Sequence, residues 1–399
     1  MDKRVIPIII TGFFTIFIAF AVRYSYGLLL PEMLPDLGST KTGAGVVYSS
    51  YFVAYTIFSP LLGLLTDRYN ARFLLFFFIS LLSVGVFLMS LSTSILHASL
   101  FFTLVGIGQS ACWVPVVTVI QRWVSEKRRG AVLAIVDLGS ASGIATISFS
   151  IPFIVGAYTW RGGWVTLGFI ALLVALMNLL FMKSDPAKKT KVLSPKTDPA
   201  TAATKKVLST LLLKKEFWSI GIAYLLVGFC VLIPFAFLTS YATEKLAIPF
   251  NSATRLIGVI AVAGIAGKLV LGFLSDTIGR VNTMIVCGVF LALGGIGMAY
   301  SDSFQLLIVS SAILGIGYGA VWPLYAAAAR DFFPSQFAGS VIGLWTLLMG
   351  VGSIISPMIA GWSIDFTQSY YWAFMLVTVG SVLSILVLFP LASSGKRIG

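Results

Sequence analysis

Apolar stretches of about twenty residues recur along the whole chain, separated by short polar segments. A helix of this length crosses the ~30 Å of hydrocarbon in a membrane. Backbone groups in hydrocarbon must find their hydrogen-bond partners within the protein, and a helix provides them within one segment. The sequence therefore predicts an all-α membrane protein with twelve spans, at roughly 5–30, 43–65, 73–93, 98–121, 131–155, 163–182, 218–241, 253–275, 282–300, 304–328, 339–361 and 370–391.

Composition leaves little room for any other kind of domain. Hydrophobic residues make up 58% of the chain and charged residues only 10%, whereas soluble domains carry about 25% charged residues. The longest polar stretch, 183–216, is rich in lysine, proline and threonine and is expected to be a linker. The spans and this linker leave no segment for a soluble enzyme or a nucleic-acid-binding domain.

The net charge of +13 has to be interpreted by position. If the N-terminus is cytoplasmic, most of the lysines and arginines fall on the cytoplasmic side, as the positive-inside rule requires. We therefore expect both termini in the cytoplasm and the protein in a bacterial cytoplasmic (inner) membrane, as a monomer in the lipid bilayer. The basic linker is then a topology signal, and binding of anionic lipid remains an alternative.

Two motifs occur twice in the chain at the same spacing. GLLTDRYNAR at 63–72 returns as GFLSDTIGRV at 272–281, and GIGQSACW at 106–113 returns as GIGYGAVW at 315–322. Two independent matches at one spacing indicate an internal duplication.

The duplication divides the chain into two similar halves. We expect two pseudo-symmetric six-helix bundles, 1–182 and 217–399, joined by a cytoplasmic basic linker at 183–216. An even number of spans in each half makes the two repeats parallel, and transporters built in this way bind substrate near the midplane, between the halves.

The repeated loop motif resembles a family signature. G-x-L-x-D-R at 63–68, with GFLSDTIGR as its second-half counterpart, is similar to the signature of the major facilitator superfamily. RYSYGLLLP at 23–31, RWVSEKRRG at 122–130 and GKLVLGF at 267–273 resemble its monocarboxylate porter and oxalate/formate antiporter branch. The resemblance implies a secondary active transporter of carboxylates that works by alternating access.

Lys268 lies in the middle of an apolar span, eight residues before Asp276. It is thus about 12 Å inside the membrane surface, where a charge costs ~3 kcal/mol or more and usually faces a functional cavity. In the family that the chain resembles, this position carries an arginine that holds the substrate carboxylate, with an aspartate one turn earlier. Here that earlier position is Gly264. Lys268 is predicted to bind substrate; snorkelling to the surface is the alternative.

Asp137 is the acidic residue predicted to lie well inside the membrane. In the superfamily, helices 5 and 8 face each other across the two halves, which would bring Asp137 to the depth of Lys268. A substrate anion competing for the lysine would release the carboxylate to take up a proton. Asp137 is therefore predicted to couple transport to protons, and a static interhelical ion pair is the alternative.

Arg23 is the second cation predicted within a span. It lies about eight residues from the outer end of the first span, and Tyr26 shares its helix face at i, i+3. A guanidinium can hold a carboxylate in a bidentate fork. Both residues are predicted to bind substrate, and an outer-gate role for the arginine is the alternative.

The second repeated motif suggests further polar groups along the substrate path. Gln109 and Tyr318 occupy equivalent positions in it, each between glycines or small residues and each followed by a tryptophan. We expect both to bind substrate, with Trp345 as a further candidate. Packing between helices is the alternative for the tryptophans.

The loop motif places charged residues where helices end at the cytoplasmic surface. Carboxylates there can accept from helix N-termini and pair with arginine, and such contacts can lock the two halves together in one state. The predicted gating residues are Asp67, Arg68, Arg72, Asp276 and Arg280. Simple capping of the loops is the alternative.

The function predicted from these residues is secondary active transport of small organic anions with protons, most simply of monocarboxylates such as lactate or pyruvate. An organic-anion exchanger without proton coupling is the alternative. An enzyme is disfavoured because the spans carry no Ser/His/Asp set, histidine cluster or carboxylate pair, and a transport-fold receptor because no soluble signalling domain is attached. No cofactor, metal site or nucleic acid is expected. The cysteines lack metal-ligand spacing; they are Cys112, Cys230 and Cys287.

Overall fold

The computed structural model describes residues 5–183 and 212–393. This part of the chain is helical and contains no strand, and eleven of its helical segments are long and apolar enough to cross a membrane. One of them, Arg128–Phe181, has 54 residues and is therefore about 80 Å long. It bends at Tyr158 and Thr159, whose backbone is not helical, and so makes two crossings. The predicted all-α membrane fold with twelve spans is confirmed.

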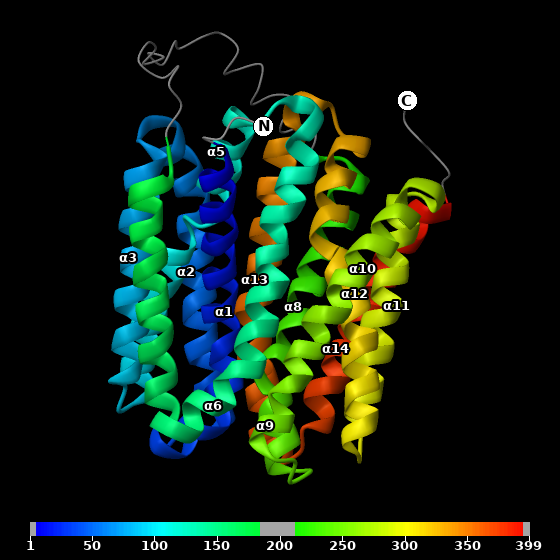
Figure 1. The fold of residues 1–399 in the computed structure, drawn as a ribbon. Coiled ribbons are helices and arrows are strands. Elements are labelled where there is room, and N and C mark those ends of the chain that lie inside the picture. The colour runs from blue at the N-terminus through cyan, green and yellow to red at the C-terminus, as the bar shows by residue number, and fades with distance from the viewer. Residues whose placement is uncertain (1–4, 184–211, 394–399) are drawn as a thin grey trace.

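The helices form two bundles that lie side by side (Figure 1). The first bundle contains α1 (Val5–Asp36), α2 (Lys41–Arg68), α3 (Ala71–Ser90), α4 (Ile95–Gln109), α5 (Val114–Trp123) and α6 (Glu126–Phe181). The second contains α8 (Lys215–Glu244), α9 (Phe250–Ala253), α10 (Arg255–Ile278), α11 (Arg280–Ala299), α12 (Phe304–Phe332), α13 (Ser335–Thr367) and α14 (Tyr371–Ser393). We call the end where α6 finishes and α8 begins the linker end, and the opposite end the far end.

Small polar side chains start several of the helices. The Thr40 side chain accepts from the N–H of Gly43 at the start of α2, and Ser94 accepts from His97 at the start of α4. Ser303 does the same at the start of α12. These bonds satisfy N–H groups that have no partner within the helix, so the turns between spans can be short.

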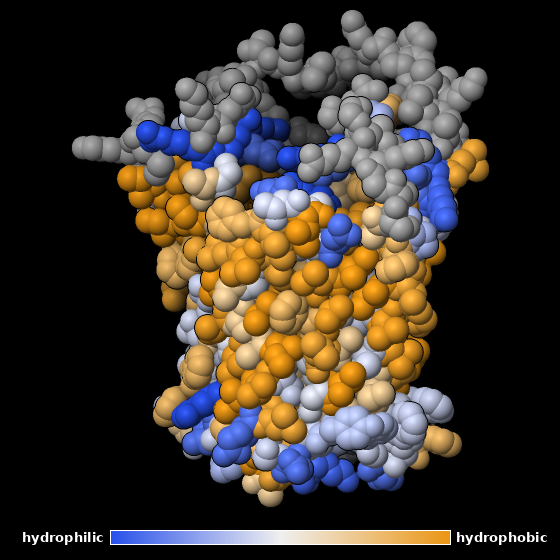
Figure 2. All heavy atoms as spheres, turned by 90° about the vertical axis from the view of Figure 1, so that its right-hand side faces the viewer, coloured by the Kyte–Doolittle hydropathy of each residue, from blue (hydrophilic) through white to orange (hydrophobic). Residues whose placement is uncertain are grey.

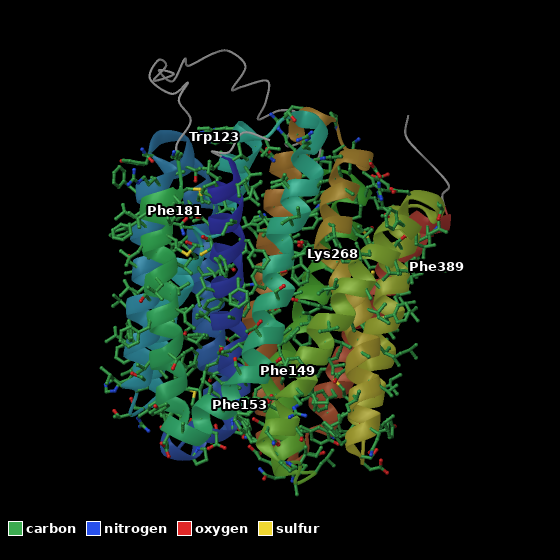
Figure 3. All side chains as sticks on the ribbon, viewed as in Figure 1. Trp123, Phe149, Phe153, Phe181, Lys268 and Phe389 are labelled. Carbon is green, nitrogen blue, oxygen red and sulfur yellow. The ribbon has the colours of Figure 1, made fainter. Side chains whose placement is uncertain are left out.

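The surface of the molecule matches a bilayer. Figure 2 shows a belt of hydrophobic side chains between hydrophilic bands at the linker end and the far end. Large apolar side chains are exposed on this belt, among them Phe149, Phe153 and Phe389, which are labelled in Figure 3. Contiguous apolar surface of this extent is stable only against lipid. The protein is an integral membrane protein.

The two bundles touch closely at the far end. A Cβ added to Gly27 of α1 would lie 1.8 Å from the carbonyl oxygen of Phe235 in α8, and one added to Gly45 of α2 would lie 2.2 Å from that of Pro357 in α13. The backbones of the two bundles are therefore in contact there. Towards the linker end, a Cβ at Gly130 of α6 would meet nothing within 4 Å.

Candidate functional site

Arg23 lies in the middle of α1 and is only 7% exposed. Its Nε donates to the Tyr51 hydroxyl over 2.8 Å. Aromatic rings surround the guanidinium carbon, with centroids 4.8 Å away for Tyr55 and 5.0 Å for Phe20. Arg23 makes no ion pair with any carboxylate in the described part of the chain. The first bundle therefore holds a buried positive charge without a counter-charge, which is unfavourable unless a ligand supplies one.

Arg23 lies farther from the end of its helix than the sequence suggested. The first span was expected to end near residue 30, but α1 continues through Pro31 and Pro35 to Asp36. Arg23 is thus about 20 Å from the end of its helix. The expected distance of about eight residues was wrong, because packing against neighbouring helices lets prolines stay within a membrane helix.

Tyrosines next to Arg23 connect the two bundles. The hydroxyls of Tyr24 in α1 and Tyr318 in α12 lie 3.2 Å apart and share a hydrogen bond. Both rings pack on Phe235 of α8, with centroids 4.2 Å and 5.1 Å away. Tyr318 therefore lies at the boundary between the bundles, beside the residue that follows Arg23.

Asp137 and Lys268 form an ion pair across the two bundles. Lys268 Nζ donates to Asp137 Oδ2 over 2.5 Å, which joins α10 to α6. The Asp137 side chain remains 29% exposed and that of Lys268 31% exposed. Figure 3 shows Lys268 between the linker end and the far end of the molecule. In this state the lysine charge is neutralised by Asp137, whereas that of Arg23 is not.

The position one turn before Lys268 is closely packed. A Cβ at Gly264 would lie 3.3 Å from the Tyr318 ring and 3.4 Å from the carbonyl of Gly315. α10 packs closely on α12 at this position, and the carboxylate near Lys268 comes from α6.

Two predicted substrate residues have structural contacts in the described part of the chain. The Tyr26 hydroxyl donates to the Ala44 carbonyl over 2.8 Å, and its ring packs on Phe102 inside the first bundle. Trp345 is completely buried, and its Nε1 donates to the Phe217 carbonyl over 2.9 Å inside the second bundle. The structure does not bring Trp345 to the surroundings of Arg23.

Gln109 is the last residue of α4 and is 2% exposed. Its amide makes no hydrogen bond to any described residue, and its Oε1 is fully buried. The span expected at 98–121 is interrupted directly after it, because α4 ends at Gln109 and α5 begins at Val114. Gln109 thus stands at a helix break at membrane depth.

In the second repeat, the predicted gating residues form ion pairs that stay within the second bundle. Arg280 Nη1 lies 2.7 Å from Asp276 Oδ1, and Arg280 Nε lies 3.2 Å from Asp331 Oδ2 of α12. These contacts tie α10, α11 and α12 together and do not join the two bundles. In the first repeat, Arg72 lies against the Phe73 ring. The side chains of Asp67 and Arg68 lie outside the described part of the chain.

The far end carries a polar network that sequence reasoning missed. Lys41 at the start of α2 is paired with Glu244 at the end of α8. Asp365 of α13 accepts from the backbone N–H groups of Lys41 and Thr42, over 3.0 and 2.7 Å. Burial and the neighbouring Glu244 charge raise the pKa of Tyr370, so its hydroxyl stays protonated and donates to Glu244 over 2.7 Å. The polar starts and ends of these spans were visible in the sequence, but which of them meet was not.

The arrangement of two six-helix bundles with charged groups between them agrees with the sequence family. The profile of the Major Facilitator Superfamily matches residues 12–301 and 256–397, which together cover most of the chain. The chain belongs to the major facilitator superfamily. This major facilitator protein is therefore a membrane transporter of small solutes.

Curated relatives and solved structures agree with this assignment. The protein is 22% identical to a hexuronate transporter of Bacillus subtilis, over 94% of this chain and 92% of the relative. It is 26% identical to monocarboxylate transporter 12 of Rattus norvegicus, over 77% of this chain and 69% of the relative. Its fold matches a bacterial homolog of the human lysosomal transporter Spinster in an inward-facing, occupied conformation, with a TM-score of 0.79 at 14% identity, covering 99% and 98% of the two chains.

Proposed function

We propose that this protein moves small organic anions, monocarboxylates such as lactate or pyruvate, together with protons by alternating access. The observation that carries the proposal is Arg23, a buried guanidinium of the first bundle without a described carboxylate partner, next to Tyr24 at the boundary between the bundles. The two relatives above support it, since their names refer to hexuronate and monocarboxylate, both of which carry a carboxylate.

The surroundings of Arg23 suit a carboxylate ligand. Aromatic rings cover the faces of the guanidinium, and cation–π contact keeps the charge stable without neutralising it. Arg23 Nε already donates a hydrogen bond to the Tyr51 hydroxyl. The two Nη groups of Arg23 are therefore the donors left for a bidentate carboxylate. Arg23 is only 7% exposed, and burial makes each such bond stronger than at a surface.

The Asp137–Lys268 pair supports coupling to protons. An anion that reaches Lys268 competes with Asp137 for the ammonium group, and the carboxylate that it displaces is then free to carry a proton. Anion and proton would therefore load together. If the pair instead stays closed throughout the cycle, the protein exchanges one anion for another without a proton.

The contacts between the bundles support a state that is closed at the far end. The backbones of the two bundles meet at Gly27 and Gly45 towards the far end, whereas a Cβ at Gly130 or Gly272, nearer the linker end, would meet no described atom within 4 Å. By the positive-inside rule the linker end is the cytoplasmic end, in a bacterial inner membrane. This state therefore faces the cytoplasm, and Asp67, Arg68 and Arg72 are proposed to act at its gate.

Uptake into proteoliposomes tests the proposal. We expect labelled lactate or pyruvate to enter the vesicles of the wild-type protein, and Arg23→Gln to reduce the initial rate at least about 30-fold, because the anion loses its fixed counter-charge. Arg255→Gln is the matched control, since Arg255 is an exposed arginine at the start of α10 and should leave uptake intact. A folded Arg23→Gln protein that transports at the wild-type rate would contradict the proposal.

A further inference from the structure

One buried hydroxyl of the first bundle has no partner. The Tyr48 side chain of α2 is completely buried, and its hydroxyl makes no hydrogen bond to any described residue. Burying a hydroxyl in this way is unfavourable, because the group gives up its hydrogen bonds to water and gains none. A phenylalanine would fill the same space without this cost. We therefore expect the hydroxyl to serve a ligand that is bound during only part of the transport cycle.

Packing fixes where this hydroxyl lies. The Tyr48 ring contacts three other rings, with centroids 5.1 Å away for Tyr26, 5.4 Å for Phe52 and 6.1 Å for Phe102. These neighbours come from α1, α2 and α4. Because protein interiors are packed as densely as organic crystals, a ring held among three helices has little freedom to carry its hydroxyl to a partner elsewhere.

The position of Tyr48 is close to the charge of Arg23. Phe52, which packs on Tyr48, also lies against Arg23, with its ring centroid 5.6 Å from the guanidinium carbon. Tyr51, whose hydroxyl accepts from Arg23, is one turn further along α2. The Tyr48 hydroxyl interacts electrostatically with Arg23 and with the Tyr24 hydroxyl. The unpartnered hydroxyl and the unneutralised guanidinium therefore lie in the same part of the first bundle.

A carboxylate complements both groups. Its two oxygens offer about four lone-pair sites, and a bidentate guanidinium uses two of them. A phenol hydroxyl can donate to a third. We propose that Tyr48 donates a hydrogen bond to the substrate carboxylate that Arg23 holds. This rests on the proposed binding of the carboxylate at Arg23.

This role predicts effects of opposite sign in the empty and the loaded protein. Tyr48→Phe removes one oxygen and leaves the ring in place. The empty protein loses an unpaired buried group and should be as stable as before or more stable. The loaded protein loses a hydrogen bond to an anion and should bind its ligand more weakly. A hydroxyl with a structural partner would instead destabilise the empty protein when it is removed.

Calorimetric titration and thermal unfolding of the full-length protein in lipid nanodiscs test the proposal. The ligands are L-lactate, pyruvate and propionate, which share the carboxylate and differ at C2. We expect Tyr48→Phe to weaken binding of all three acids by a similar factor, about tenfold or more, because the lost bond goes to the group that they share. The melting temperature of the empty variant should equal or exceed that of the empty wild type.

Two other hydroxyls provide matched controls. Thr11 of α1 has a buried, unpartnered hydroxyl like that of Tyr48, but it lies twelve residues before Arg23, about 18 Å along the helix. Thr11→Val should keep the wild-type affinity. Tyr241 of α8 is a buried tyrosine whose hydroxyl donates to the Ser301 carbonyl. Tyr241→Phe should lower the melting temperature of the empty protein and also keep the wild-type affinity.

The possible failures are distinguishable. Unchanged affinity in Tyr48→Phe, or a loss confined to one of the three acids, would overturn the role of Tyr48 and leave carboxylate binding at Arg23 standing. A lower melting temperature of the empty variant, or its failure to fold, would show that the hydroxyl has a structural partner and would overturn the role as well. If none of the three acids binds to the wild type, the proposed transport of carboxylates fails, and the role of Tyr48 fails with it.

Discussion

The two cations at membrane depth differ in what surrounds them. Lys268 is paired with Asp137, while Arg23 has aromatic rings and a tyrosine hydroxyl around it. The sequence located both charges, because a charge within an apolar span is visible without a structure. The family resemblance also placed Asp137 at the depth of Lys268, on the facing helix. The aromatic surroundings of Arg23 could not be predicted in this way, since they depend on how α1 packs on α2. The sequence favoured Lys268 as the main counter-charge of the substrate, whereas we propose Arg23 for that role and Lys268 for coupling.

Asp137→Asn should separate proton coupling from anion binding. The amide cannot take up a proton, so accumulation driven by an inward pH gradient should fall to the level without a gradient, about tenfold or more below the wild type. Exchange of one anion for another needs no proton and should persist. Both are measured in proteoliposomes, by gradient-driven uptake and by counterflow.

Asp302→Asn is the control for this experiment, because Asp302 is an exposed carboxylate between α11 and α12. If wild-type uptake is the same with and without the pH gradient, the protein is an exchanger. Asp137 would then be a tether between the two bundles.

Helix boundaries show where prediction from the sequence ends. The number of spans and their order follow from apolar length, and the duplication follows from repeated motifs. The break after Gln109 did not, because Pro115 and Pro323 give similar local signals while only the first accompanies an interrupted helix. The extra length of α1 was missed because Pro31 and Pro35 suggest an end where tertiary packing continues the helix.

The contact between α1 and α8 gives a prediction about one element. Alanine at Gly27 would place its Cβ 1.8 Å from the Phe235 carbonyl, so the far end cannot close as it does here. Transport by Gly27→Ala should be slowed at least about fivefold, since one of the two alternating states is destabilised by roughly 1 kcal/mol or more. Initial uptake rates check this, together with the melting temperature.

Gly343→Ala in α13 is the matched control, because a Cβ there meets nothing within 4 Å and helical alanine is well tolerated. If Gly27→Ala transported as fast as Gly343→Ala, close contact of α1 and α8 would not be needed in the cycle.

For the whole molecule, the polar network at the far end holds this state together. Asp365 of α13 accepts hydrogen bonds from backbone N–H groups at the start of α2, and the Lys41–Glu244 ion pair joins the same helix to α8. Asp365→Asn should weaken these charge-assisted bonds by about 1 kcal/mol and raise the population open at the far end several-fold.

The separation of the far ends can be measured by double electron–electron resonance between two spin labels. The labels are attached at Glu32→Cys and Asn251→Cys, exposed residues of the two bundles. The native cysteines are buried and should not react. Asp302→Asn removes the same charge outside the network and serves as the control. An unchanged distance distribution in Asp365→Asn would mean that the network does not set the equilibrium.

The pairing of Asp137 with Lys268, beside an unneutralised Arg23, has an electrical consequence. The empty centre carries one net positive charge, and a centre loaded with one anion and one proton carries the same. The proposed symport is then electroneutral, since no net charge crosses the membrane in a complete cycle. Membrane voltage would add nothing to the accumulation ratio, and the pH difference alone would set how far the cell can concentrate its substrate.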